Sequence, residues 1–468
     1  MNRANFMWVA LWLSWVVVTS SKAQTPAPDS SISREWTSSD GKKVTAEYLG
    51  LQGKMVMMRL QGGKVIPYPV EKLSAEDATF VQKNPLIYRE TWKGWPSVGI
   101  PMVNVDVTEK PSVEGKFIYT TPNFRFTTDA NLGGTLMKDL ARVFELTFQL
   151  QSKAPLGILA SPTDGSYRAD LFGKRADYQR EGGPSSSAGV YLLKTKRFLA
   201  PLELMGVEPG DAGWRRSSKE DYDTTTIVHE LTHMLTHDLL VNLPLWVNEG
   251  YAEFMSGIPI ESGCFRTSKE KIREGLIKTA TEEAWLFYKN DYGTTNAQRP
   301  DTKKIAVSLL PVSSILQMKD EEWEGASVSG NGPRTSSGTF RGTKPSQRLM
   351  LARYRTAHLI LYYYIQIEGE AGVAKLRRFL DENRKCMSQY LNYSEEFKQY
   401  EAAMDAFMRQ PGVEPLGEGR IRYPENLTPP KAPVAPFADV EMVKSGGLKF
   451  LLGDNTSVVL PPKLDSLE

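Results

Sequence analysis

Three of the four histidines in this chain, His229, His233 and His237, fall within nine residues, and the first two belong to the stretch His-Glu-Leu-Thr-His. Residues four apart lie on one face of an α-helix, so His229 and His233 can direct a ring nitrogen each toward a single zinc ion. Glu230 is placed beside them to accept a proton from a zinc-bound water, whose pKa the metal lowers to about 7. A helix that carries histidines by chance is the alternative. The spacing predicts a zinc site with hydrolytic chemistry.

A catalytic zinc site needs a third protein ligand and leaves a fourth position open. The spacing HExxHxxGxxH would place a glycine at Thr236 and a third histidine at Leu239, and neither residue matches. His237 continues the helical series, but it lies roughly 12 Å along the helix from His229 at about 1.5 Å per residue, too far to share one ion. We therefore expect His237 at the surface or behind the ligands.

A glutamate on a following helix is the remaining candidate for the third ligand. The segment that begins Leu243-Pro244 and ends at Phe254 contains Glu249 and Glu253. Proline suits the first turn of a helix, so the segment is predicted to be helical from about Pro244. One face of this helix is expected to carry three residues: Trp246, Gly250 and Phe254.

The stretch HELTH followed by WVNEGYAEF resembles the gluzincin zinc peptidases, the superfamily of thermolysin and the membrane alanyl aminopeptidases, and is most similar to its bacterial peptidase-MA-like branch. The resemblance implies that Glu249 is the third zinc ligand and that Glu253 supports a ligand histidine. Fifteen residues separate His233 from Glu249, fewer than in the better-known relatives, and nineteen separate His233 from Glu253. Glu253 is therefore kept as the alternative ligand.

Residues 348–368 form the strongest helix pattern downstream of this motif, and they place Tyr354, His358 and Tyr362 on one face. Hydrolysis of a carbonyl develops negative charge on its oxygen, which a positioned donor stabilises. The resemblance implies a downstream tyrosine in this role, and Tyr354 is the first choice before His358. Packing in the core is the competing interpretation of such aromatic side chains.

The peptidase-like domain is expected over residues 116–410, with an α+β, thermolysin-like fold of a mixed sheet and a mostly helical active-site half. Alternation and periodicity predict strands at 117–121, 124–128 and 156–160, and a helix at 136–150. The apolar run 188–193 is predicted to be a strand, either at the sheet edge, where it would pair with extended substrate, or inside the sheet. Residues 325–346, rich in Gly, Ser and Thr, are expected to be a loop.

Residues 34–84 alternate as short strands between turn signals, and end in a helix start in which Ser74 precedes Asp77 by three residues. This pattern resembles the Sla-type homology domain, a small all-β, Src-homology-3-like barrel. Such a barrel is either a spacer or a module that binds a peptide or an envelope component. Residues 24–33 and 85–115 are expected to be linkers, and 411–468 a Pro-rich tail with a possible hairpin at 448–460.

The N-terminus has the pattern of a cleavable signal peptide over residues 1–23, because a basic start precedes the apolar run 6–18 and Ser-Lys-Ala precedes the cut after Ala23. An uncleaved anchor is the alternative. Cleavage would leave a secreted or periplasmic protein without a membrane span. The net charge of +2, with both signs interleaved, predicts no nucleic-acid partner. Cys264 and Cys386 could pair in an exported protein or remain thiols.

The sequence therefore predicts an exported zinc metallopeptidase that cleaves peptide or protein substrates through a Zn²⁺-activated water. Its ligands are His229, His233 and Glu249, and Glu230 is the general base. No GAMEN-like motif that would grip a free amino terminus precedes the HExxH stretch, which favours an endopeptidase over an aminopeptidase. The alternative function is a catalytically idle, peptidase-like scaffold or envelope-binding protein whose N-terminal barrel is the active part.

Overall fold

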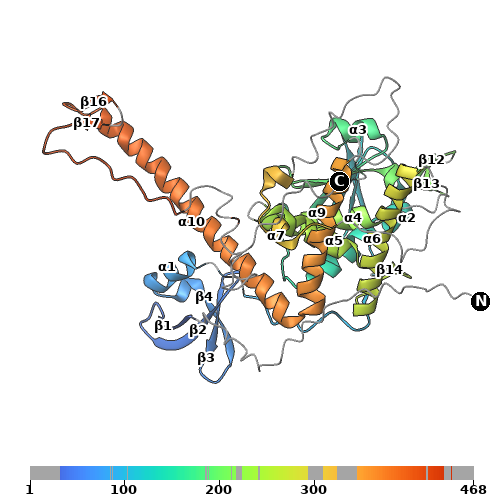
Figure 1. The fold of residues 1–468 in the computed structure, drawn as a ribbon, viewed down its shortest axis with the longest axis horizontal. Helices are drawn as coiled ribbons and strands as arrows, with labels where there is room; N and C mark the ends of the chain where they lie inside the picture. The colour runs from blue at the N-terminus through green and yellow to red at the C-terminus, as the bar shows by residue number, and fades with distance from the viewer. Residues whose placement is uncertain are drawn as a thin grey trace, which may run out of the picture. The chain divides into compact units, whose positions relative to one another are not determined.

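The computed structural model describes residues 32–84, 86, 88–102, 104–184, 187, 189–211, 213–217, 224–240, 243–292, 309–323, 345–417, 420–436 and 444. Contacts divide the chain into unit 1, up to Tyr88, and unit 2, from Arg89 onward. The fold is mixed α+β, with a small antiparallel sheet in unit 1 (Figure 1). The predicted signal peptide, residues 325–344 of the predicted loop and the possible hairpin at 448–460 lie outside the described residues.

Unit 1 is a four-stranded antiparallel sheet followed by a short helix. The order of its strands is β1-β2-β3-β4. Gly41 and Gly53 adopt φ values of 80° and 59° in the turns, a region that side-chain-bearing residues disfavour. Ser74 caps α1, since its hydroxyl accepts the backbone N–H of Asp77 at 3.2 Å, and this confirms the predicted helix start. The elements are β1 (Ile32–Thr37), β2 (Lys43–Gln52), β3 (Met55–Leu60), β4 (Val65–Pro69), η1 (Val70–Lys72) and α1 (Ala75–Lys83).

Unit 2 contains a six-stranded mixed sheet in the order β10-β11-β9-β8-β7-β6. The middle strand β9 is parallel to both of its neighbours, and the other pairs are antiparallel. Helix α2 packs on the sheet through Phe144, whose ring lies edge-on to Phe126 and Phe198. The predicted strands at 117–121 and 124–128 and the predicted helix at 136–150 are confirmed. The elements are β6 (Thr108–Val113), β7 (Lys116–Thr120), β8 (Phe124–Thr128), α2 (Gly133–Ser152), β9 (Tyr167–Phe172), β10 (Val190–Leu192) and β11 (Arg197–Pro201).

The strand predicted at residues 156–160 is wrong, because this segment is a turn followed by irregular chain outside the sheet. Its backbone groups are paired with helices instead. The carbonyl of Ile158 accepts the side-chain amide of Gln151 at 2.7 Å, and the N–H of Ala160 donates to the carbonyl of Leu235 at 2.7 Å. An apolar run this short is equally compatible with buried irregular chain, and periodicity does not separate the two.

The linker predicted at residues 85–115 is also wrong from Arg89 onward. Strand β5 (Ile100–Pro101) pairs with β15 (Cys264–Phe265), and β6 is an edge strand of the large sheet. The buried Arg89 guanidinium forms an ion pair with Asp381 at 2.8 Å. Unit 2 therefore begins near Arg89, about 27 residues before the predicted boundary at 116.

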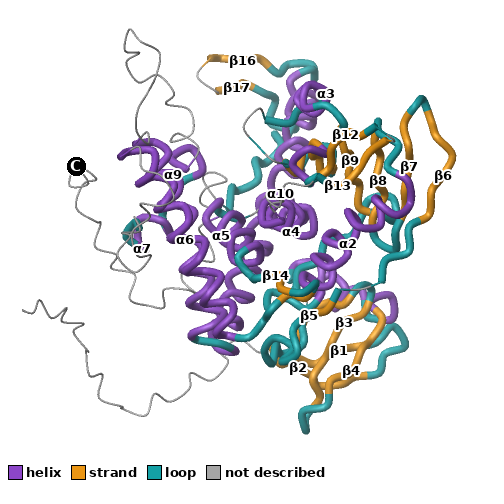
Figure 2. The backbone as a smooth tube through the Cα atoms, turned by 90° about the vertical axis from the view of Figure 1, so that its right-hand side faces the viewer, coloured by secondary structure: helices purple, strands orange, loops and turns teal. Residues whose placement is uncertain are grey.

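The remaining elements of unit 2 are mostly helical. Helices α4, α5, α6 and α9 gather on one side of the sheet (Figure 2), whereas α3 packs on the other face through Tyr178. The predicted helix at 348–368 is confirmed, but it begins at Pro345, within the predicted loop, and its last turns are π-helical. The second half of α10 projects from the rest of unit 2 and ends at a small hairpin of β16 and β17 (Figure 1). These elements are α3 (Arg175–Arg180), η2 (Leu202–Met205), β12 (Val207–Gly210), β13 (Gly213–Arg216), α4 (Thr224–Leu240), α5 (Leu245–Ser256), β14 (Ile260–Glu261), α6 (Lys269–Tyr292), α7 (Val312–Leu316), α9 (Pro345–Tyr362), η5 (Tyr363–Ile367), α10 (Glu370–Met408), β16 (Glu414–Gly417) and β17 (Arg420–Arg422).

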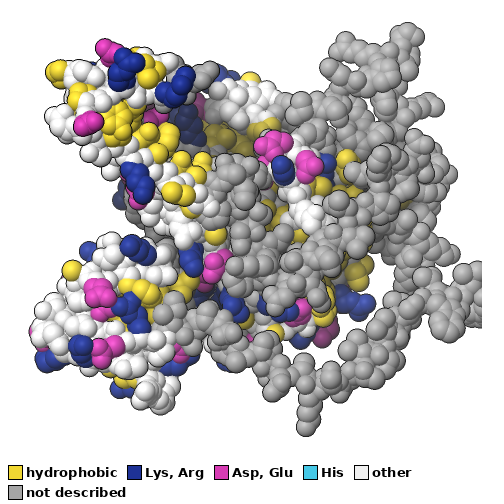
Figure 3. Space-filling view, turned by 60° about the vertical axis from the view of Figure 1, so that its left-hand side comes forward, with side chains coloured by type: hydrophobic (Ala, Val, Ile, Leu, Met, Phe, Trp, Pro, Cys, Tyr) yellow, Lys and Arg dark blue, Asp and Glu magenta, His cyan; other side chains and the backbone are white. Residues whose placement is uncertain are grey.

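Three further expectations concern the pattern of surface charge, a membrane span and the pairing of the cysteines. Lys and Arg side chains are interleaved with Asp and Glu over the described surface visible in Figure 3. None of the helices within the described ranges is long and apolar enough to cross a membrane. Cys264 and Cys386 are both buried, and no disulfide joins them.

Candidate metal centre

Helix α4 brings the two histidines of the HExxH stretch together. Its apolar residues Ile227, Leu231 and Met234 are buried at helical spacing, which leaves the opposite side for polar groups. His229 and His233 lie one turn apart on that side, and their Nε2 atoms are 3.2 Å from each other. The helix therefore presents two imidazole nitrogens at one point.

Helix α5 adds a carboxylate at the same point. The Oε2 atom of Glu249 lies 3.3 Å from Nε2 of His229 and 3.5 Å from Nε2 of His233. All three side chains are largely buried, with exposed fractions of 14%, 12% and 17% for His229, His233 and Glu249. The structure therefore brings together the three residues that the sequence predicted as ligands.

The donor set fits a zinc ion. Zinc prefers imidazole nitrogen and carboxylate oxygen at about 2.0 to 2.2 Å, and tetrahedral ligands at about 2.0 to 2.1 Å are roughly 3.3 to 3.4 Å from one another. The separations of 3.2, 3.3 and 3.5 Å among the three donor atoms match this geometry. Three protein ligands also leave one tetrahedral position for water or substrate, as in catalytic zinc sites.

Glu253 contacts the other side of the His229 ring. Its Oε1 atom lies 3.2 Å from Nδ1 of His229, one helical turn beyond Glu249 on α5. A carboxylate at Nδ1 holds the proton on that nitrogen and leaves Nε2 free to bind a metal. This contact is the one expected of a residue that supports a ligand histidine, and it lies on the side of the ring away from Glu249.

The cluster has an excess of negative charge. Burial opposes a charge on the His229 ring, but the carboxylates of Glu249 and Glu253 outweigh it and hold the pKa of His229 well above its usual value. Burial also opposes charge on Glu249, whereas His233 and His229 lower the pKa of that carboxyl below its usual range. Two buried carboxylates around one imidazole therefore favour an added cation.

Glu230 lies outside the three-residue cluster and points to the sheet. Its Oε2 atom accepts the backbone N–H of Tyr191, in β10, at 2.8 Å. Strand β10 is the edge strand of the large sheet, so the N–H of Tyr191 faces away from β11. The strand observed here, Val190–Leu192, is shorter than the one predicted at 188–193. It lies at the edge of the described sheet, next to the predicted general base.

The close approach of α5 and α9 positions Tyr354. A Cβ atom at Gly250 would lie 2.8 Å from the backbone of Ala357, so only glycine permits this packing. The ring of Tyr354 lies 6.5 Å from that of His229 and 5.4 Å from that of Trp323. Burial, and then the charges of Glu249 and Glu253, raise the pKa of Tyr354, which keeps its hydroxyl protonated and able to donate.

His358, the second choice for that role, packs behind the cluster instead. Its ring is 4% exposed and lies edge-on to Phe254 at 6.1 Å. Burial lowers the pKa of His358 to about 4, against an opposing effect of Glu253, so the ring is neutral near pH 7. His358 is therefore a buried neighbour of α5. Packing in the core explains His358 better than it explains Tyr354.

Two other residues were placed differently or missed by the sequence analysis. Of the two positions expected for His237, at the surface or behind the ligands, the first is wrong: it is 4% exposed, and its Nδ1 atom lies 3.0 Å from the carbonyl oxygen of Met234. Tyr191 was assigned no role, although its N–H contacts Glu230. The apolar run around Tyr191 predicted the strand, but no local signal links residues 39 apart in the chain.

Comparison with known proteins identifies only the N-terminal part of the chain. Residues 24–86 match the family SLA1 homology domain 1 (SHD1). No curated protein and no solved structure matches the chain. The N-terminal part of the chain is therefore similar to SHD1, in partial agreement with the expected Sla-type domain at 34–84.

Proposed function

We propose that unit 2 is a zinc-dependent metallopeptidase of the gluzincin type, which hydrolyses internal peptide bonds. The observation that carries this proposal is the convergence of His229, His233 and Glu249, whose donor atoms all lie within 4.8 Å of one another. A separate carboxylate, Glu230, lies next in sequence to the first ligand. Hydrolysis needs both features, because metal ligands cannot also serve as a free base.

The three ligand residues would hold the ion through two Nε2 atoms and one carboxylate oxygen. When bound, zinc lowers the pKa of water and polarises a carbonyl group. Glu253 keeps the His229 ring in the orientation that the ligand set requires, through the 3.2 Å contact at Nδ1. This division of roles makes Glu249 a ligand and Glu253 a positioning residue.

Glu230 acts as the general base and proton carrier. Its carboxylate accepts a proton from the attacking water and then donates it to the nitrogen of the leaving amine, so that the C–N bond breaks as a neutral amine departs. The N–H of Tyr191 holds the carboxylate by a 2.8 Å hydrogen bond before substrate arrives. The hydroxyl of Tyr354 is the donor proposed for the carbonyl oxygen as it gains negative charge.

Strand β10 is the proposed platform for the substrate backbone. An extended peptide can pair with an exposed sheet edge through main-chain hydrogen bonds. β10 occupies the edge of the described sheet, and its outward N–H, that of Tyr191, is bound to Glu230, so a pairing peptide would take over this N–H from the carboxylate. A peptide along this edge would pass beside the base and the ligand cluster, which favours an internal bond as the site of cleavage.

We propose that this activity lies outside the cytoplasm, in the periplasm or the medium, because the N-terminus has the pattern of a signal peptide. The SHD1 domain then has the role of a binding module for a peptide or an envelope component, which raises the local concentration of substrate. The competing function, an idle scaffold in which this module is the active part, predicts zinc binding without turnover.

The test is to measure zinc content and turnover of a mixed peptide library on the same purified protein. We expect about one zinc per chain and cleavage within peptides whose amino termini are blocked. Chelation should remove both zinc and cleavage, and added zinc should restore them. A zinc-loaded protein that cleaves no peptide in the library would favour the scaffold function.

A further inference from the structure

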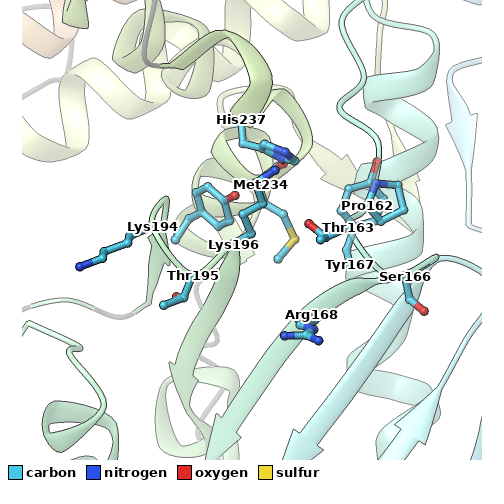
Figure 4. Close-up of a pocket in the computed structure, with 11 residues that line it drawn as sticks. Pro162, Thr163, Ser166, Tyr167, Arg168, Lys194, Thr195, Lys196, Met234 and His237 are labelled. Atoms are coloured by element: carbon cyan, nitrogen blue, oxygen red, sulfur yellow. The ribbon is translucent and has the colours of Figure 1, made fainter. Parts of the chain in front are cut away.

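A pocket of about 280 Å³ lies between the second half of α4 and the strands β9 and β10 (Figure 4). Its buried wall is formed by Tyr167, Tyr191, Met234 and His237, whose exposed fractions are 8% or less. In Figure 4, His237 and Met234 lie on one side and Pro162 on the opposite side. The wall is thus mainly aromatic and apolar.

The pocket adjoins the proposed catalytic centre. His237 lies four residues beyond His233, one helical turn or roughly 6 Å along α4. Tyr191 lines the pocket with its side chain, while its backbone N–H binds Glu230. A peptide that lies along β10 would therefore place one of its residues at this pocket.

The rim of the pocket is basic. Lys194 and Lys196, in the turn between β10 and β11, line it together with Arg168, and among the described residues no Asp or Glu does so. Arg168 forms an ion pair with Asp164, and both lysines are exposed. The hydroxyl groups of three further residues are available at the rim: Thr163, Ser166 and Thr195.

Lys196 has a φ of 52°, in the left-handed region that favours glycine, as Glu114 and Ser262 do in two other hairpin turns, so this conformation belongs to the turn. Glycine at this turn position would avoid that backbone strain, and yet the chain carries a long cation there.

We propose that this pocket binds a carboxylate-bearing residue of the peptide substrate. Its volume of about 280 Å³ is just below the range of roughly 300 to 1,000 Å³ typical of small-molecule sites, and therefore suits one residue. The aromatic wall packs against the aliphatic part of that residue, and the two lysines bind the carboxylate. The carboxylate belongs either to an acidic side chain or to the C-terminus of the peptide. The assignment of a peptide as ligand rests on the proposed function.

The proposal is tested by peptide binding to the Glu230→Gln protein, which keeps the pocket but is expected to cleave about 10²- to 10⁴-fold more slowly. The ligands are short peptides with an amidated C-terminus and no charged side chain apart from one Glu, whose position differs from peptide to peptide. Each is compared with its neutral twin, the same peptide with Gln at that position. A second pair differs only in a free or amidated C-terminus. We expect tighter binding of one carboxylate-bearing member by about 5- to 10-fold at low salt, and a smaller difference at high salt.

The decisive variant is Lys194→Gln with Lys196→Gly, which removes both charges and relieves the backbone at position 196. We expect the preference for carboxylate to disappear while the neutral twins bind as before. Lys194→Arg with Lys196→Arg should retain the preference. Lys278→Gln, an exposed lysine on α6, is the control for loss of charge elsewhere.

A Glu preference assigns the pocket to an acidic side chain, and a free C-terminus preference assigns it to the chain end; both support the proposal. Equal binding of the twins, a preference that survives in the neutral variant, or no binding at all would overturn it. Turnover of the unaltered protein is measured separately. A protein that cleaves peptides without a lysine-dependent preference contradicts only the pocket, and one that shows the preference without cleavage contradicts only the peptidase.

Discussion

Two buried carboxylates, Asp77 in unit 1 and Glu249 in unit 2, have opposite surroundings. Asp77 accepts the N–H of Thr37 at 2.6 Å and the hydroxyl of Ser74 at 3.1 Å, and it pairs with Arg34 at 2.5 Å. Its acceptors are thus matched by protein donors, as is usual for a buried structural carboxylate.

Glu249 instead faces two imidazole nitrogens, and the His229 ring already faces Glu253 at its other nitrogen. A neutral imidazole carries one N–H, so the cluster lacks positive charge unless a proton or a metal ion is added. The comparison separates a carboxylate that stabilises its fold from one that we propose binds a cation. The predictions below test this difference, from the largest expected effect on turnover to the smallest.

Loss of a ligand should have the largest effect. His233→Ala removes one of three donors, so we expect zinc binding and turnover to fall below detection, with little change in the thermal unfolding of the metal-free protein. Metal analysis after dialysis and peptide cleavage measure both. The control is His358→Ala, which removes a neighbouring histidine outside the cluster. If the His233→Ala protein retained zinc fully, His233 would not be a ligand.

Glu230→Gln should separate chemistry from metal binding. The amide has nearly the same shape but cannot accept a proton, so turnover should fall by about 10²- to 10⁴-fold while zinc content is unchanged. Kinetics at saturating substrate, together with metal analysis, provide the measurement. Normal turnover in this variant would exclude Glu230 as the base.

Tyr354→Phe should reduce kcat by about 10²-fold, the cost of one lost donor to the carbonyl oxygen, without altering zinc affinity. Tyr362→Phe, on the same helix and also partly buried, is the matched control and should retain activity. Equal kcat values for the two variants would show that Tyr354 has only a packing role.

Glu253→Ala should have a smaller effect on zinc than Glu249→Ala. Loss of a residue that orients a ligand histidine typically costs about 10- to 100-fold in affinity or activity, whereas loss of a ligand removes a metal bond. Competition with a chromogenic chelator gives both affinities. The reverse order would make Glu253 the ligand.

Asp77→Asn should affect stability and leave turnover of short peptides unchanged. Loss of the buried ion pair with Arg34 should destabilise unit 1 by about 2 to 4 kcal/mol, as followed by urea unfolding. A chain shortened to start at Arg89 should likewise cleave short peptides at the rate of the longer protein, because unit 2 has its own core. A large loss of turnover in either protein would show that unit 1 contributes to the catalytic site.

Features with a local physical cause were predictable from the sequence. The spacing of His229 and His233, the cap of Ser74 on α1 and the strand alternation around Phe124 each depend on neighbours within a few residues. Features that depend on distant partners were not predictable. The bond from Tyr191 to Glu230 and the pairing of Ile100 with Phe265 join segments whose local sequence carries no mark of the partner.

The most direct test of the central claim is zinc-edge anomalous scattering from crystals of the protein grown with zinc. We expect one peak per chain, at about 2.0 to 2.2 Å from Nε2 of His229, Nε2 of His233 and a carboxylate oxygen of Glu249, with Glu253 at Nδ1 of His229. A peak bound by Glu253 with Glu249 turned away, or crystals with no peak between α4 and α5, would contradict the account.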